Sequence, residues 1–102
     1  MIHVIATIEV ADGQLNDFLA AFRALTHTVR DEDGCIEYGP AVDLATEISG
    51  LAPARANMVT VIEKWTSPAA LAAHLKAPHM ATYREKAKHM IAGVSIQVLA
   101  PA

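Results

Sequence analysis

The stretch EKWTSPAALAAHLKAPHM, residues 63–80, contains the change of pattern that decides the fold. Its first residues are typical of the end of a strand, and Ser67 followed by Pro68 is a strong helix start. The serine oxygen can accept a free backbone amide, while proline has no amide to satisfy. We expect this helix to run to about Lys76. Pro78 then either kinks it or starts a second helix, because proline cannot continue an unbroken one.

The flanking sequence predicts four strands and one further helix. Alternation of apolar residues indicates the strands, and apolar residues three and four apart indicate the helices. The second strand contains Gly39 and Pro40, so we expect it to lie at a sheet edge or to contain a bulge. The expected strands cover residues 2–10, 35–43, 57–65 and 94–99, with a loop at 44–56, a helix from about 15 to 30 capped by Asp12, and a last helical segment that ends at Gly93.

This strand and helix order is β-α-β-β-α-β, the ferredoxin-like arrangement of the α+β class, in a single domain over residues 1–102. It predicts a four-stranded antiparallel sheet with both helices on one face. Apolar residues occur on both sides of the first and last strands, so we expect the second face to be buried too. Two such sheets packed face to face would form a homodimer that encloses an α+β barrel.

Composition supports a second subunit and excludes several classes of partner. Apolar residues make up 53% and charged residues 19% of the 102 residues, which is more apolar than a small monomer normally hides. The net charge of −3 does not provide the excess of positive charge that binds the phosphate backbone of nucleic acid. Cys35 is the only cysteine, so no internal disulfide forms. No stretch reaches the length of a membrane span, and we expect a cytoplasmic protein.

The candidate chemistry lies around Trp65 and His74. Glu63 and Trp65 are two apart on a strand and share one face. His74 falls between Leu71 and Leu75 on the helix face that packs inward. Burial favours a neutral imidazole, which can act as a base. The alternative is that His74 binds a backbone carbonyl or Glu63 and only fills the core, and that Trp65 is a packing residue.

Other motifs give little support for chemistry. His79 and Tyr83 are four apart and could both line a pocket. The five histidines contain no HxxxH pair with a third ligand nearby, so a metal site is not expected. Phosphate-binding glycine motifs and the serine-hydrolase motif are absent from the sequence. Cys35 has no obvious base beside it and is expected to be a small apolar residue.

Two segments, DEDGCIEYGPAVD (31–43) and VTVIEKWTSPAALAAHLKAPHMATYRE (59–85), strongly resemble the antibiotic biosynthesis monooxygenase superfamily, particularly its quinol monooxygenase branch. The resemblance covers nearly the whole chain. It implies a homodimeric barrel that oxygenates phenolic or quinol substrates without flavin, haem or metal.

The resemblance also implies roles for individual residues. His74 would be the base, or the donor that holds the quinolate oxygen, with Glu63 or His79 orienting it. Trp65 and Tyr38 would form flat walls around the substrate. The remaining expected substrate-binding residues are Tyr83 and Arg84, which follow His79 on the last helix.

Departures from other branches of this superfamily narrow the resemblance. Polyketide-oxidising relatives have an asparagine where this chain has Val61, so the residue that they use to handle oxygen is absent here. The positions that correspond to the haem-degrading triad hold Ala6, His74 and Arg84, which disfavours haem degradation.

Two other functions remain open from the sequence. One is isomerisation of a small phosphorylated signal sugar in the same type of barrel, with His74 and Tyr83 moving a proton and Arg55 and Arg84 holding the phosphate. The other is a non-catalytic dimer whose cavity binds an apolar ligand or none. In that case His74→Leu would be neutral or stabilising.

Overall fold

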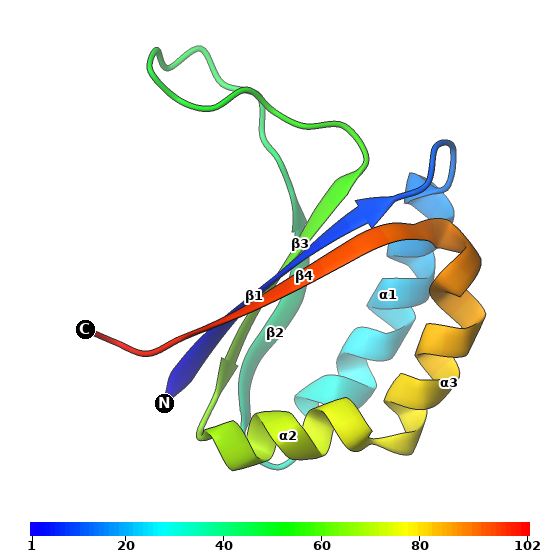
Figure 1. Ribbon diagram of the computed structural model, residues 1–102, viewed down its shortest axis with the longest axis vertical. Helices are drawn as coiled ribbons and strands as arrows, with labels where there is room; N and C mark the ends of the chain where they lie inside the picture. The colour runs from blue at the N-terminus through cyan, green and yellow to red at the C-terminus, as the bar shows by residue number, and fades with distance from the viewer.

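The structure is a computed structural model that describes residues 1–102. Its element order confirms the ferredoxin-like α+β fold (Figure 1). The elements are β1 (Ile2–Val10), α1 (Leu15–Arg30), β2 (Cys35–Val42), β3 (Met58–Trp65), α2 (Pro68–Lys76), α3 (Pro78–Ala87), a 3-10 turn (Lys88–Met90) and β4 (Ile91–Leu99).

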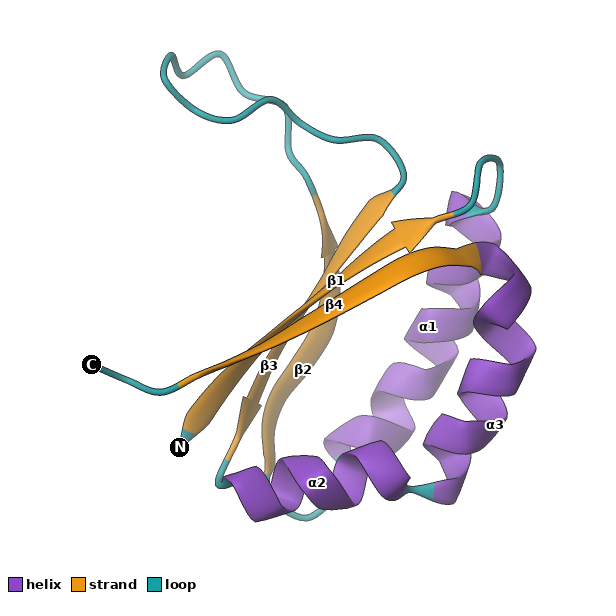
Figure 2. Cartoon of the chain, in the orientation of Figure 1, coloured by secondary structure: helices purple, strands orange, loops and turns teal.

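The four strands form one antiparallel sheet in the order β2-β3-β1-β4. All three helices lie on one face of this sheet, which leaves the other face bare (Figure 2). Ala6 of β1 pairs with Val61 of β3 and Ile96 of β4, so these side chains project together toward the helices. The cavity described below lies on this helix side.

The core forms where α1 packs on the sheet. Phe18, Phe22 and Val29 of α1 are buried against the apolar residues of β1 and β3. The ring of Phe22 stacks on Tyr38 of β2, with ring centroids 5.6 Å apart. This aromatic contact fixes the edge strand β2 against the helix layer.

Pro78 starts a second helix. Ala77 takes an extended conformation, with φ −63° and ψ 140°, as a residue before proline generally does. The predicted end of the last helical segment at Gly93 is wrong. The 3-10 turn ends the helix earlier, and Gly93 lies inside β4 opposite Glu9.

The start of α1 also differs from the prediction. The residue before the helix is Gln14, and no side chain caps the first turn. Asp12 instead accepts a hydrogen bond from the Asn57 side chain at 3.0 Å. Its carboxylate therefore ties the β1–α1 turn to the start of β3.

β2 is an edge strand, as predicted from Pro40. The loop between β2 and β3 projects beyond the sheet (Figure 1). Arg55 closes its base by donating three hydrogen bonds to the carboxylate of Asp43, from the backbone amide, Nε and Nη2.

The bare face of the sheet carries apolar side chains. Ile62 and Leu99 are each 41% exposed, and Ile5 between them is half-buried. In the single chain this face is therefore open to solvent, and the predicted burial of both faces would need a partner.

Candidate functional site

The loop after α1 brings an acidic residue over α2. Gly34 has a φ of +83°, and a Cβ there would lie 2.6 Å from the Ala70 side chain and 2.7 Å from Thr66 Oγ1. The Gly34 carbonyl also accepts the Thr66 amide at 2.8 Å. Only glycine allows this close approach. Glu32, two residues earlier, is thereby placed above the helix.

His74 points inward from α2. Ser67 Oγ accepts the Ala70 amide at 3.2 Å and fixes the first turn of the helix. Two turns later His74 is buried, with only 2% of its surface exposed, as the sequence predicts.

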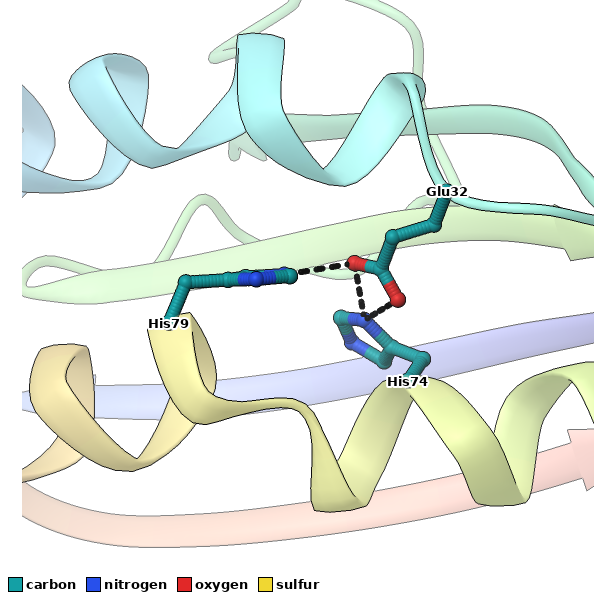
Figure 3. A group of neighbouring side chains, drawn as sticks. All are labelled: Glu32, His74 and His79. Atoms are coloured by element: carbon teal, nitrogen blue, oxygen red, sulfur yellow. Dashed lines mark hydrogen bonds and ion pairs between the residues drawn. The ribbon is translucent and has the colours of Figure 1, made fainter.

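One carboxylate holds two imidazoles (Figure 3). His74 Nδ1 lies 2.9 Å from Glu32 Oε2 and 3.2 Å from Oε1. His79 Nε2, at the start of α3, lies 2.9 Å from the same Oε2. Because an ionised carboxylate only accepts hydrogen bonds, the nitrogens that face it are the protonated ones. In neutral His74 this leaves Nε2 with a free lone pair.

Aromatic rings pack against the other sides of His74. The Trp65 ring lies 4.7 Å from the imidazole centroid, and the Tyr38 ring lies 5.4 Å from it. Trp65 Nε1 donates a hydrogen bond to Glu63 Oε1 at 2.9 Å. The packed rings restrict the imidazole to one orientation.

Glu63 is a buried carboxyl on the same strand face as Trp65. Its burial raises the pKa, and this is opposed by the hydrogen bond from Trp65 and by the nearby His74. No hydrogen bond joins Glu63 to His74. Glu32 makes the contact to His74 that the sequence assigned to Glu63 or His79.

A cavity of about 330 Å³ opens beside His74. Nine of its twelve lining residues are hydrophobic, and the other three are Glu63, His74 and Arg84. Arg84 Nη2 donates a hydrogen bond to the Leu75 carbonyl at 2.6 Å, which fixes the guanidinium at the cavity wall. Tyr38 is among the apolar lining residues.

Three of the predicted site residues lie outside the cavity lining. Trp65 supports His74 and Glu63 from behind, and His79 binds Glu32. Tyr83 packs edge-on against Phe22, with centroids 5.8 Å apart. Its hydroxyl is buried without a hydrogen-bond partner, and burial raises its pKa.

Glu32 is the residue that the sequence reasoning missed. It lies in the charged run from Arg30 to Asp33, which is typical of a solvated helix end. Nothing local distinguishes it from Asp31 or Asp33. Its contacts with His74 and His79 span 42 and 47 residues, and the nearest signal is Gly34, which draws the loop onto α2.

Comparison with known proteins decides the family. Residues 1–86 match the family model described as antibiotic biosynthesis monooxygenase. The chain belongs to this family. This match confirms the superfamily resemblance of the two sequence segments, and the chain is accordingly a monooxygenase. None of its helices has both the length and the apolar character needed to cross a membrane.

Similar proteins span nearly the same length. A relative in Escherichia coli strain K12, named probable quinol monooxygenase YgiN, is 38% identical over 105 residues, which covers 99% of this chain and 98% of that protein. The crystal structure of PA3566 from Pseudomonas aeruginosa is 27% identical, with a TM-score of 0.80, over 99% of this chain and 93% of that one. Rv0793 from Mycobacterium tuberculosis is 25% identical, with a TM-score of 0.79, over 99% and 94%.

Proposed function

We propose that this monooxygenase oxidises a quinol or a related phenolic aromatic substrate with O2, and that it needs no cofactor. The observation that carries the proposal is the position of His74. Its Nδ1 is held by Glu32, and its ring lines a largely apolar cavity. The name of the E. coli relative supports the same substrate class.

The cavity suits a flat aromatic ring. Its volume of about 330 Å³ lies at the lower end of the usual range for small-molecule sites, and apolar lining with a few polar groups is typical of them. Phe22 and Tyr38 supply aromatic walls. His74, Glu63 and Arg84 are the only ionisable side chains, other than tyrosine, that line it.

The substrate itself can replace a cofactor as the reductant. His74 takes a phenolic proton, and the electron-rich quinolate passes one electron to O2. Recombination forms a C–O bond, and cleavage of the O–O bond then leaves a hydroxyquinone and one water. The quinol supplies all four electrons, so quinol and O2 balance hydroxyquinone and water. The protein removes the proton, holds the anion and excludes water.

Each neighbouring residue then has a definite role. Glu32 fixes the tautomer of His74 and stabilises the imidazolium that forms when the base takes its proton. Arg84 places a positive charge where the quinolate oxygen develops negative charge. Trp65 keeps Glu63 in place and restricts the imidazole.

The isomerase alternative requires a phosphate clamp. Arg55 is bound to Asp43 at the base of the β2–β3 loop and does not line the cavity. Arg84 is then the single arginine in the cavity wall. One guanidinium that already binds a carbonyl is a weak site for a phosphate dianion.

The test is oxygen uptake with a chemically reduced naphthoquinol, with the spontaneous rate measured without protein. We expect the wild type to exceed this background and His74→Ala to lose a factor of about 10² to 10⁴, the usual contribution of a general base. His89→Ala, which removes an exposed histidine, is the matched control. A wild-type rate equal to the background would favour the non-catalytic binding dimer, and an unchanged rate in His74→Ala would rule out His74 as the base.

We also propose that two copies pair through the bare face of the sheet. Ile5, Ile62 and Leu99 form an apolar surface there, and pairing would remove it from water. Light scattering after size exclusion should give twice the chain mass. Ile62→Glu should lower it to one chain, whereas Ile48→Glu in the exposed β2–β3 loop should not. A monomeric wild type would rule the pairing out.

A further inference from the structure

We infer that Glu32, His74 and His79 form a binding site for a divalent transition-metal ion, for which Zn²⁺ is the best fit, and that the bound ion inhibits the enzyme. The binding itself goes beyond the proposed function and does not depend on it. Only the inhibition rests on the proposed role of His74.

The donor atoms are already grouped. The two histidine nitrogens each lie 2.9 Å from Glu32 Oε2, and one ligand atom from each residue lies within 4.8 Å of the others. In a tetrahedral site with metal–ligand distances of about 2.0–2.1 Å, donor atoms lie roughly 3.3 Å apart. Each contact must therefore open by only about half an ångström.

The three ligands have the right chemistry for zinc. Two imidazoles and one carboxylate, with a fourth position open to water, are a common ligand set for Zn²⁺. Imidazole nitrogens disfavour Mg²⁺ and Ca²⁺, which prefer oxygen ligands. The sequence did not predict this group because the histidines are five residues apart and the third ligand comes from the loop after α1.

The group is both rigid and accessible. The rings of Trp65 and Tyr38 pack on His74, which has 3% of its side chain exposed. The side chains of Glu32 and His79 are 15% and 29% exposed. Neither of these two lines the cavity, so an ion reaches the group from solvent without passing through the substrate site.

Metal binding would change what His74 offers to the cavity. The ion would bind Nδ1 through its lone pair, so the single proton of a neutral imidazole would move to Nε2. Nε2 would then donate a hydrogen bond and could no longer accept a proton from the substrate. An ion on the far side of the ring would in this way block the base without occupying the cavity.

Calorimetric titration of tag-free protein with ZnCl₂, and with CoCl₂ followed by visible absorption, tests the site. We expect one ion per chain and the Co²⁺ bands of a four-coordinate nitrogen and oxygen site. His79→Ala and Glu32→Gln should each weaken binding at least tenfold, since loss of a ligand costs no less than loss of a residue that supports one. His89→Ala, which removes an exposed histidine, should bind as the wild type does.

Absence of one-to-one binding, or equal binding by the wild type and both ligand variants, would overturn the site. Thermal unfolding of each variant without metal shows whether a loss of binding reflects a loss of folding. Oxygen uptake in the presence of Zn²⁺ forms a separate arm: the wild type should be inhibited at the concentrations that fill the site, and His79→Ala should resist. Binding without inhibition would reject the effect on His74 and leave the site in place.

Discussion

Replacing Glu32 by glutamine tests the link between the loop after α1 and the chemistry in the cavity. The amide has nearly the shape of the carboxylate and keeps an oxygen that can accept a hydrogen bond from His74 Nδ1, so the ring should keep its place between Trp65 and Tyr38. What changes is charge. The group 2.9 Å from Nδ1 is no longer an anion when His74 becomes a cation.

The size of the effect follows from the kind of hydrogen bond that is lost. A hydrogen bond to a charged group contributes about 1.5–3 kcal/mol, whereas a neutral one contributes about 0.5–1.5 kcal/mol. Neutral His74 already donates to an ionised carboxylate, so only the added attraction between that carboxylate and the imidazolium counts toward the barrier, and we take about 1–2 kcal/mol as its order of magnitude. Its loss therefore raises the barrier to proton removal, and kcat should fall about 5- to 30-fold. KM should change little, because Glu32 does not line the cavity.

The assay is steady-state oxygen uptake with a reduced naphthoquinol, corrected for the spontaneous rate. Asp31→Asn is the matched control, since it removes one negative charge from an exposed neighbouring residue and should leave kcat unchanged. A Glu32→Gln variant with the wild-type kcat, or with a loss confined to KM, would refute the idea that the carboxylate stabilises a charged His74.

Two further predictions concern stability. Gly34→Ala should lower the free energy of unfolding, measured in urea, by about 1–3 kcal/mol more than Gly13→Ala does. Gly13 is the control because it also has a positive φ, but a Cβ there meets nothing within 4 Å. Equal losses in the two variants would contradict the close packing of Gly34. Glu63→Gln should raise the melting temperature at pH 7. Burial raises the pKa of Glu63 above its ordinary 4.5, so the stability it contributes is present below pH 4.5 and is lost as pH rises through the raised pKa. The gain should shrink toward pH 4, and a lower melting temperature at pH 7 would show that the carboxylate is stabilised where it lies.

The parts of this structure that depend on local chemistry could be predicted from the sequence. Ser67 starts α2 as predicted, and the spacing of His74 from Leu71 predicts its burial, whereas the predicted burial of Leu75 is wrong because that side chain is 38% exposed. The shared face of Glu63 and Trp65 follows from strand geometry, and their hydrogen bond is what a buried carboxylate beside an indole requires. Glu32 could not be found in this way, because its contacts depend on how a glycine turn packs on a helix that begins more than thirty residues later.

The break between α2 and α3 is what brings His74 and His79 together. In a continuous helix His74 and His79 would be five residues, or about 140°, apart around the axis, and the two rings would face different surroundings. The extended Ala77 before Pro78 ends that periodicity and turns the first residues of α3 back toward the loop after α1. Both imidazoles then reach one oxygen of Glu32. Pro78, from which the sequence predicts a kink or a second helix, is therefore what allows a single carboxylate to bind both rings.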